Sequence, residues 1–517
     1  MDPMVRALLD PAAYDHPVTR VQLLETHISW VFLTGRYAYK VKKPVQFGFV
    51  DFSSLERRRH CCEEELRLNR RLAPDLYLAV VEIHGPAAAA CLHGSGPVIE
   101  TAVRMREFRQ RDLLPAALAR GAVSPPRIDR LARELAAFHN AAAAAPASSP
   151  WGSPDTVLEP ALANLEALRG CGRLPDDHDS LQRWIRAERD RLLPLLHERR
   201  ARQRIRECHG DLHLGNMVLQ GGRITVFDGI EFSEPLRWID PISDLAFLLM
   251  DLRHRDQELL ALRLLHGWLE WGGDHAALPL LPWYLAYRAL VRAKVAGLRL
   301  AQSGLPAAEA ASLADDLAHY LEDARAAMRP PRGALLITHG VSGCGKSHAA
   351  AILCSRGWIQ LRSDLERLRL FGRWGCPPAG SLLGGDAYAP EVSAHLYDTV
   401  LAEAAAAGLA AGLAVVVDAT FLHGARRRRF RNLAARAGAG FGILAPAVTP
   451  ALAQRRIEAR SRAGDDPSEA DAAVLQRQLQ GIEPLASEER SWLLSGVDDP
   501  LLAQRGSGLR VPEPAAA

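Results

Sequence analysis

The sequence predicts two domains: an α+β domain with a small strand-rich lobe and a larger helical lobe, then an α/β domain built on a parallel sheet. Residues 28–50 carry strand-like alternation, whereas Leu- and Ala-rich helical patterns dominate from about 127 to 328. Beyond residue 333, apolar strands alternate with helical patterns, as they do in parallel-sheet α/β domains. The segment "MRPPRG" at 328–333 separates the two regions.

These patterns predict a first domain over residues 1–329, a second over residues 330–505 and a disordered tail over residues 506–517. A chain of 517 residues is too long for one compact core. No apolar run approaches the ~20 residues that span a bilayer, and the N-terminus lacks the apolar segment of a signal peptide. The eight cysteines include no C-x-x-C pair, which argues against zinc sites and disulfide frameworks.

We therefore expect a cytoplasmic protein with no membrane partner. The net charge of +3 gives no sign of bulk attraction to nucleic acid. Composition does not indicate an oligomeric state.

A glycine-rich loop, "GVSGCGKS" at 340–347, follows an apolar strand and opens a helical pattern. Its spacing is G-x-x-x-x-G-K-[ST], whose glycines let backbone N–H groups point into a concavity at a helix N-terminus. The lysine of such a loop reaches the β- and γ-phosphates, and the hydroxyl binds Mg²⁺. We expect the nucleotide to be held by Gly340, Gly343, Gly345, Lys346, Ser347 and His348, with Ser347 also a metal ligand.

Two aspartates follow apolar strands in the same half of the chain. Asp418 ends "LAVVVD", where a carboxylate supports Mg²⁺ in P-loop enzymes, although it could instead cap a following helix. Asp364 lies just past the strand "WIQL", near the carboxyl edge of the expected sheet. It is a candidate for the base that accepts a substrate hydroxyl proton, and helix N-capping is an equally weighted alternative.

Two groups of arginines follow, at 426–431 and at 455–462. Guanidinium groups suit the spread charge of a transferring phosphoryl group, although most residues in a charge run lie on a solvated helix face. We expect Arg460 and Arg462 to belong to a lid over the nucleotide.

Residues 334–485 resemble the small P-loop kinases grouped with the polynucleotide 5′-kinase, gluconate kinase and zeta-toxin families. The matching segments are "GVSGCGKS", "RSDLERLRLFG", "VVVDATFLHGARRRRF" and the region "R…DPSEAD". The resemblance implies ATP-dependent phosphorylation of a hydroxyl group, and it implies no particular substrate.

A second set of polar residues lies in the stretch "CHGDLHLGNMVLQGGRITVFDGIEF" at 208–232. His209, Asp211 and Asn216 keep the spacing H-x-D-x-x-x-x-N of protein kinases, in which the aspartate accepts the hydroxyl proton and the asparagine binds Mg²⁺. Asp228 ends the strand "RITVFD" at the position of a metal-binding carboxylate. We expect His209 to be structural.

A lysine on a strand, paired with a helix glutamate, should complete such a site. "YAYK" places Lys40 on a strand, on the same face as Lys42. In the helix expected at about 54–73, Glu65 shares a helical stripe with Cys61, Leu68 and Leu72, where an unpaired carboxylate would be costly. We predict a Lys40–Glu65 pair, with Glu64 as the second choice.

Residues 20–325 resemble the aminoglycoside phosphotransferase/choline kinase family, which has a protein-kinase-like fold. The resemblance rests on "HGDLHLGN", the downstream "DG" and "WIDPISDLAFLLMDL". It implies that Asp211 is the catalytic base, that Asn216 and Asp228 bind the metal, and that Lys40 contacts the nucleotide. Asp240 or Asp244 would support them. Together the halves resemble a bacterial fusion of an aminoglycoside phosphotransferase-like domain with an ATP-binding P-loop domain.

The sequence thus predicts an enzyme with two ATP·Mg²⁺ sites, each transferring a γ-phosphoryl group to a hydroxyl of a small or polar substrate. In one alternative the N-terminal half is a non-catalytic binding or regulatory module and the P-loop half is the only kinase. In another the P-loop half phosphorylates nucleic-acid 5′ ends, with the arginines as a strand-binding face.

Overall fold

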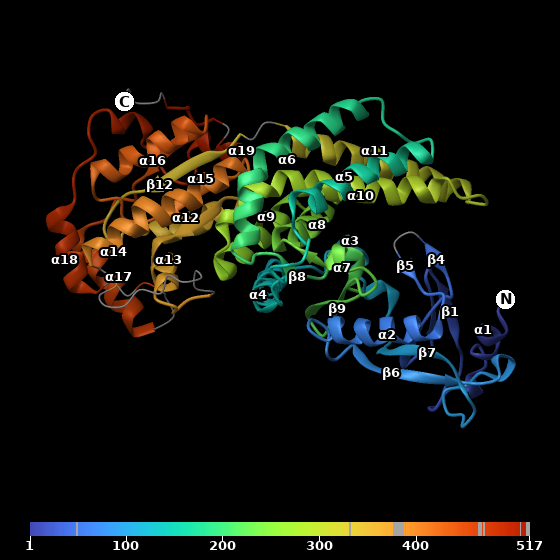
Figure 1. Ribbon diagram of the computed structural model, residues 1–517. Coiled ribbons are helices and arrows are strands. Elements are labelled where there is room, and N and C mark those ends of the chain that lie inside the picture. The colour runs from blue at the N-terminus through green and yellow to red at the C-terminus, as the bar shows by residue number, and fades with distance from the viewer. Residues whose placement is uncertain are drawn as a thin grey trace. The chain divides into compact units, whose positions relative to one another are not determined.

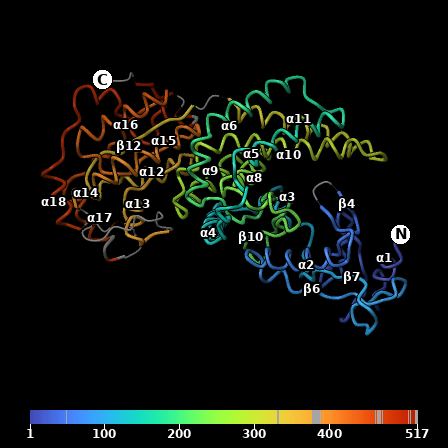
Figure 2. The backbone as a smooth tube through the Cα atoms, in the orientation of Figure 1, coloured from blue at the N-terminus to red at the C-terminus, as the bar shows by residue number. Residues whose placement is uncertain are grey.

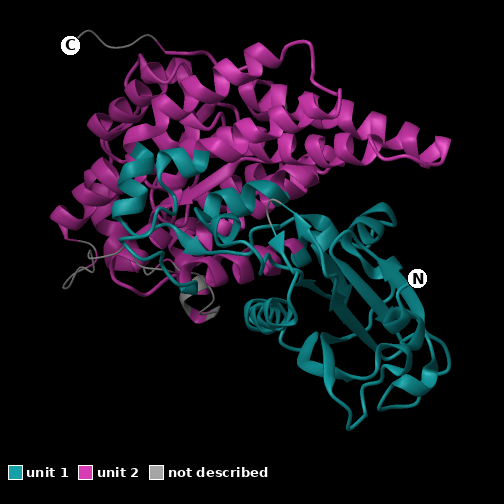
Figure 3. Cartoon of the chain, turned by 45° about the vertical axis from the view of Figure 1, so that its right-hand side comes forward, with its two compact units in different colours: residues 1–127, 141–157, 195–248 teal, residues 128–140, 158–194, 249–517 magenta. Residues whose placement is uncertain are grey.

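The computed structural model describes residues 1–47, 50–329, 332–375, 387, 389–463, 468, 471–506 and 508–512 (Figure 1). The chain divides into two compact units, residues 1–127, 141–157 and 195–248 in the first, and residues 128–140, 158–194 and 249–517 in the second (Figure 3). The boundary expected between residues 329 and 330 stays a prediction, because residues 330 and 331 lie outside the described residues. None of the helices in the described part of the chain is long and apolar enough to cross a membrane.

The first unit contains an antiparallel sheet with the strand order β1-β2-β3-β7-β6. Its strands are β1 (Gln22–Glu25), β2 (Ser29–Leu33), β3 (Tyr37–Lys42), β6 (Tyr77–His84) and β7 (Val98–Arg106). The predicted turn joins β2 to β3, with Gly35 at a φ of 86°. Because strand side chains alternate, Tyr39 and Val41 pack into one apolar cluster and Lys40 and Lys42 face the opposite side of β3.

Helix α2 (Leu55–Asn69) packs against β6 and β7. Its buried residues are Arg58, Cys62, Glu65, Leu68 and Asn69. The predicted stripe was therefore wrong at both ends: Cys62 rather than Cys61 is buried, and the helix ends at Asn69, before Leu72. Glu65 and Leu68 belong to both stripes, so the expected burial of Glu65 is confirmed.

The first unit also contains a hairpin of β9 (Met217–Gln220) and β10 (Arg223–Val226), which follows the loop that contains Asp211. The other helices and strands of the unit include α1 (Pro3–Ala7), β4 (Gln46–Phe47), β5 (Val50–Asp51), α3 (Leu114–Ala119), β8 (Arg206–Glu207), α7 (Glu234–Arg237) and β11 (Trp238–Ile239). Four helices have residues in both units: α4 (Pro125–Ala141), α5 (Pro154–Gly170), α6 (His178–Ala201) and α8 (Pro241–His254).

The last segment of the second unit, residues 249–517, starts with long helices, as the Leu/Ala-rich patterns predict. These are α9 (Glu258–Gly272), η5 (His275–Leu280), α10 (Leu281–Leu300) and α11 (Ala307–Met328), and α10 and α11 run side by side (Figure 2).

A parallel sheet of the order β13-β14-β12-β15 follows in the same unit. Its strands are β12 (Ala334–Thr338), β13 (Ile359–Arg362), β14 (Ala414–Asp418) and β15 (Gly440–Leu444), which confirms the predicted parallel sheet. Its helices are α12 (Lys346–Ser355), α13 (Ser363–Leu370), α14 (Pro390–His395), α15 (Ala402–Ala410), α16 (Gly424–Arg436), α17 (Pro450–Ala463), α18 (Ala472–Gly481) and α19 (Ala503–Gly506). The carboxyl ends of β12, β13 and β14 meet at one edge, where ligands bind in open α/β sheets.

The C-terminal segment differs from the disordered tail that the sequence predicts. Leu509 is buried in the core that also contains Leu336, Trp358 and Val416. The backbone N–H of Phe441 donates to the carbonyl of Arg510. The expectation of disorder is therefore wrong for residues 508–512, because an apolar side chain there finds a place against β15, and residues 513–517 lie outside the described residues.

Candidate active sites

The glycine-rich loop lies between β12 and α12, as the sequence predicts. Gly340, Gly343 and Gly345 have φ values of 136°, 79° and 102°, which L side chains rarely adopt. A Cβ atom at Gly343 would also lie 2.5 Å from the carbonyl oxygen of Ala453 in α17. These positions need glycine, both for the backbone conformation and for the close approach of α17.

Lys346, the first residue of α12, is only 7% exposed. Its ammonium group donates to the carbonyl oxygen of Val341 at 2.7 Å, so the side chain lies across the loop that it follows. Ser347 and the exposed His348 line a cavity of about 400 Å³ at this edge of the sheet. The cavity is also lined by Gly343 and Gly345.

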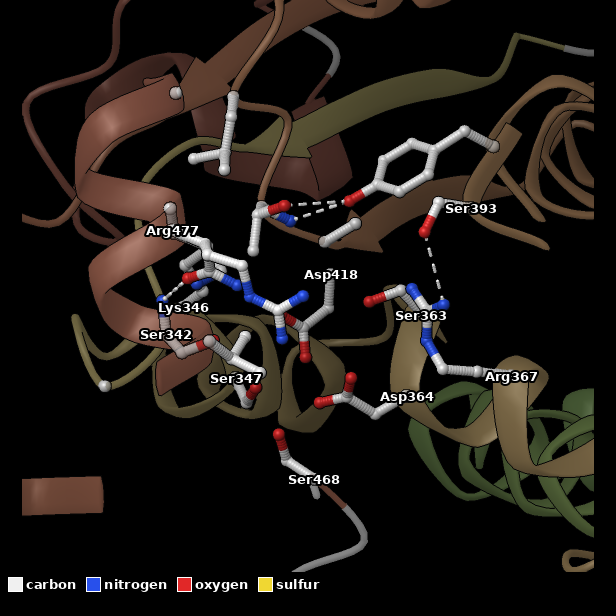
Figure 4. Close-up of a pocket in the computed structure, with 18 of the residues that line it drawn as sticks. Ser342, Lys346, Ser347, Ser363, Asp364, Arg367, Ser393, Asp418, Ser468 and Arg477 are labelled. Carbon is white, nitrogen blue, oxygen red and sulfur yellow. Dashed lines mark hydrogen bonds between the residues drawn. The ribbon is translucent and has the colours of Figure 1, made fainter. Parts of the chain in front are cut away.

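Asp418, the last residue of β14, is buried at the floor of this cavity (Figure 4). It accepts a hydrogen bond from Gln360 at 2.9 Å and is hydrogen-bonded to Ser347. Burial raises the pKa of Asp418, and the hydrogen bond with Ser347 opposes that rise. The next helix along the chain beyond β14, α16, starts only at Gly424, so Asp418 does not cap it. The carboxylate and the hydroxyl are oxygen ligands of the kind that Mg²⁺ takes.

Asp364 lies in the first turn of α13, whose N-cap residue is Arg362. The capping alternative is therefore excluded, and the carboxylate of Asp364 lines the same cavity as Ser347 and Asp418 (Figure 4). Residues of three separate segments thus converge there: the glycine-rich loop at 340–347, called the phosphate loop below, the end of β14 and the start of α13.

Among the described residues, arginines other than the expected Arg462 line the cavity. Arg426, Arg456 and Arg477 line it, and Arg456 donates to the carbonyl of Gly343 at 3.3 Å. Arg462 is exposed on α17, beside Glu458, and it does not line the cavity. The side chain of Arg460 lies outside the described residues. Helical periodicity could not single out Arg456, because the pattern of a helix does not show which of its polar side chains meets a cavity.

The first unit brings the polar residues of its own site together. Lys40 pairs with Glu65 at 2.8 Å, which confirms the predicted contact, and with Asp228 at 2.5 Å. Glu64 instead pairs with Arg67 on the surface of α2 at 2.8 Å. The contact between Lys40 and Asp228 was not predicted.

Lys42 is fully buried and forms ion pairs with both Glu65 and Glu231. Burial alone would raise the pKa of Glu65, but the charges of Lys40 and Lys42 hold it at about 2. Burial raises the pKa of Glu231, and Lys42 opposes that rise. Sequence reasoning noted Lys42 only as a neighbour on the strand face, and no motif pointed to Glu231.

The loop with Asp211 is held by backbone and side-chain hydrogen bonds. Asn216 donates to both the carbonyl oxygen and the carboxylate of Asp211 at 3.0 Å. Asp244 accepts the backbone N–H groups of His209 and Gly210 at 3.0 Å each, which fits the supporting role that the family resemblance implies. Gly210 has a φ of 86°, and a Cβ atom there would lie 2.7 Å from the carbonyl oxygen of Leu236.

Histidine side chains fasten this loop. His209 is buried, and its Nε2 lies 2.9 Å from the carbonyl oxygen of Phe227, in keeping with the structural role expected for it. Burial lowers the pKa of His209, which favours the neutral ring. His213 accepts the backbone N–H of Gly215, and its Nε2 lies 3.4 Å from Asp211. Asp240 forms an ion pair with Arg199 at 2.5 Å. Of the two aspartates expected to support the loop, it is Asp244 that accepts from the loop backbone.

Asp228 has a φ of 63°, in the left-handed region. Its backbone N–H donates to Tyr77 at 3.1 Å, and the next N–H, of Gly229, donates to Asn69 at 2.8 Å. Asn69 itself donates to the carbonyl of Glu65 at 2.9 Å. The strained turn is therefore tied to α2 and to β6, an arrangement that no local sequence motif indicates.

Comparison with known families agrees with both halves of this description. Residues 49–281 match a model described as "Phosphotransferase enzyme family", and residues 335–485 match one described as "AAA domain". Solved structures that resemble the chain include the GDP and kanamycin complex of APH(2")-IIia, at 16% identity and a TM-score of 0.39, covering 63% of this chain and 98% of that one. A choline/ethanolamine kinase family protein from Mesorhizobium loti has 16% identity and a TM-score of 0.38, covering 63% and 97%.

The predicted fold, a kinase-like domain followed by a P-loop domain, is confirmed by the family matches, and both domains are of types that use nucleotide for phosphoryl transfer. Curated relatives extend across nearly the whole chain. The uncharacterized protein Rv2004c of Mycobacterium tuberculosis is 31% identical over 470 residues, covering 89% of this chain and 91% of that protein, and Mb2027c of Mycobacterium bovis matches with the same values. The chain therefore belongs to the family of these mycobacterial proteins, and in this chain a segment of the phosphotransferase family precedes a P-loop AAA domain.

Proposed function

We propose that the chain is an ATP-dependent phosphotransferase with two nucleotide sites, each transferring the γ-phosphoryl group to a hydroxyl of a small or polar molecule. The observation that carries the proposal is the convergence of the phosphate loop, Asp418 and Asp364 in one cavity. It supplies, in one place, the parts that phosphoryl transfer needs: backbone amides for phosphate, oxygen ligands for Mg²⁺ and a carboxylate base.

In the P-loop site, the loop and Lys346 would hold the β- and γ-phosphates, and Ser347 with Asp418 would hold Mg²⁺, which neutralises charge on the phosphates when bound. Asp364 would take the proton from the acceptor hydroxyl while the oxygen of that hydroxyl forms a bond to the γ-phosphorus. The bond from that phosphorus to the bridging oxygen would break, and ADP would leave. Arg456 and Arg477 line the cavity where guanidinium groups offset the charge of the transferring group.

In the N-terminal site, Asp211 would be the base, Asn216 and Asp228 the metal ligands, and Lys40 the contact to the nucleotide phosphates. The hydrogen bond from Asn216 to Asp211 and the contact of Lys40 with Asp228 support the assignment, because they join these four residues in two directly contacting pairs. Glu65 would orient Lys40.

The acceptor of the P-loop site would carry an anionic group. Arg426 lies on α16 with its guanidinium carbon 4.3 Å from the ring centroid of Tyr397, and both residues line the cavity. Among the described residues Arg426 has no carboxylate partner, whereas its neighbour Arg427 pairs with Glu489 at 2.8 Å. A guanidinium group that faces a cavity without a counter-ion favours a carboxylate or a phosphate there.

The test follows labelled γ-phosphate in the full chain with Lys346→Ala, Asp211→Asn and both changes together, against sugars, sugar acids, nucleosides, aminoglycosides and RNA 5′ ends. Two active sites predict that each single variant retains transfer to one group of acceptors and that the double variant retains none. If Lys346→Ala alone abolishes all transfer, the N-terminal half is a binding module. If the double variant remains fully active, both assignments are wrong.

A further inference from the structure

Helix α13 presents different residues on two of its faces. Asp364 and Arg367 are three positions apart and line the cavity of the P-loop site. Glu366 and Arg369 are also three positions apart, and both are buried. Residues two positions apart in an α-helix are turned by about 200°, so the second pair faces away from the cavity.

The buried face of α13 is bound to a residue outside the P-loop fold. Glu366 accepts from Arg369 at 3.1 Å, and its other carboxylate oxygen lies 3.2 Å from Nε2 of His275, the first residue of η5. His275 lies in the segment 49–281 that matches the phosphotransferase family. Burial alone would raise the pKa of Glu366, but His275 and Arg369 lower it to about 2, so the carboxylate is charged and relies on both partners.

Further contacts join the same two segments beside Glu366. The carbonyl oxygen of Glu270 in α9 accepts from Arg369 at 2.7 Å and from the indole of Trp374 at 3.0 Å. The rings of Trp271 and Trp374 stack with centroids 4.6 Å apart. Gly273 has a φ of 72°, and a Cβ atom there would lie 2.7 Å from the guanidinium of Arg369, so α9 ends in a glycine that leaves room for it.

We infer that Glu366 and His275 are positioning residues for phosphoryl transfer in the P-loop site, and that the phosphotransferase-family segment thereby holds Asp364 in place. The inference rests on the proposed role of Asp364 as the base. The phosphate loop lies between β12 and α12, and Asp418 ends β14. Among the described residues, the hydrogen bonds of the Glu366 carboxylate go to His275 and Arg369 and to neither of these segments. Nucleotide binding is therefore expected to be separable from the geometry of the base.

The experiment uses the full chain with Asp228→Asn, which silences the N-terminal site, and adds Glu366→Gln, His275→Gln or Asp364→Asn. Glu403→Gln is the control, because Glu403 is an exposed carboxylate on α15 of the same domain. Turnover of labelled γ-phosphate, the Kd for ATP and amide hydrogen exchange over residues 363–370 are measured for each variant. His275→Gln retains the pair of Glu366 with Arg369 and so tests the contact without leaving Arg369 unpaired.

We expect Glu366→Gln and His275→Gln to lower kcat by about tenfold or more, because displacing a catalytic group by ~1 Å can cost on the order of 10²-fold. Exchange over residues 363–370 should become faster, while the Kd for ATP and the control stay as in the parent. Unchanged kcat and exchange in both variants, with Asp364→Asn inactive, would overturn the inference and leave the proposed function intact. A parallel loss of ATP binding would overturn it too, since it would indicate general unfolding. Full turnover in Asp364→Asn would instead refute the proposed base.

Discussion

The ammonium group of Lys40 lies 2.5 Å from Oδ1 of Asp228. The lysine expected to contact nucleotide phosphate is thus paired with the carboxylate expected to bind the metal. In the proposed function both groups would exchange this contact for ligand contacts, Lys40 with the nucleotide phosphates and Asp228 with Mg²⁺. Nucleotide binding should therefore depend on Asp228 only when the metal is present, and on Lys40 in either case.

In the Lys346→Ala background, Asp228→Asn should weaken ATP binding strongly with Mg²⁺ present and little in EDTA. Lys40→Met should weaken binding in both conditions, because the lysine interacts with the phosphates themselves. Titration calorimetry of the two variants with and without EDTA measures the difference. If both variants respond to EDTA alike, the roles of these residues have been assigned incorrectly.

Glu65→Ala should destabilise the first unit by roughly 3–5 kcal/mol, because it leaves the buried ammonium of Lys40 or Lys42 without this partner. Glu64→Ala is the matched control one position away, and it should change stability by about 1 kcal/mol or less, as expected for an exposed pair with Arg67. Urea unfolding followed by far-UV circular dichroism compares the two. Similar midpoints for both variants would contradict the buried network.

Acid should remove the contribution of Glu65. The pKa of Glu65 in the folded chain is about 2, against an ordinary value of 4.5, so its stabilisation is fully present above pH 4.5 and is lost as pH falls toward 2. By linkage the loss is on the order of 3 kcal/mol. The pKa of Glu231 is raised in the folded chain, so its contribution to the unfolding free energy changes with pH in the opposite direction. Unfolding free energies at pH 6, 4 and 3 should therefore fall more steeply in the parent chain than in Glu65→Gln, and parallel profiles would refute the assignment.

Asp364→Asn should leave ATP binding to the P-loop site unchanged and lower its turnover by ~10²–10⁴-fold, the usual contribution of a positioned general base. The substitution keeps the size of the side chain and removes the proton acceptor. The Kd and the single-turnover rate are measured with Asp228→Asn present. A variant that lost nucleotide binding together with turnover would place Asp364 among the metal ligands instead.

Arg426→Ala should raise the KM of the P-loop acceptor about tenfold or more while the KM for ATP changes little, because a charge-assisted hydrogen bond to an anionic group contributes ~1.5–3 kcal/mol. Arg428→Ala is the control, since Arg428 is exposed on the same helix and does not line the cavity. An acceptor KM that is equally insensitive to both changes would show that the acceptor is not recognised through an anion at this position.

The strands of the P-loop sheet were predictable because buried parallel strands appear as continuous apolar runs. The pair of Lys40 with Glu65 was also predictable, since a carboxylate on an apolar helical stripe needs a cation. The partners Glu231, Tyr77 and Asn69 were not, because each meets its site through contacts between segments far apart in the chain.

The arginine-rich helices show a different limit. Periodicity places Arg426 and Arg427 on α16, but only tertiary packing decides that Arg427 is buried against Glu489 while Arg426 faces the cavity. The stripe on α2 was misplaced for a similar reason. Asn69 is buried on α2 and its side-chain oxygen accepts from Gly229, and a hydrophobic pattern gives no signal for a buried polar residue.

The close approach of Gly343 to Ala453 has a mechanical consequence. No side chain separates the phosphate loop from α17 there, and Arg456 adds a hydrogen bond from α17 back to the loop at Gly343. Any side chain at position 343 would therefore have to push α17 away from the loop and break that hydrogen bond.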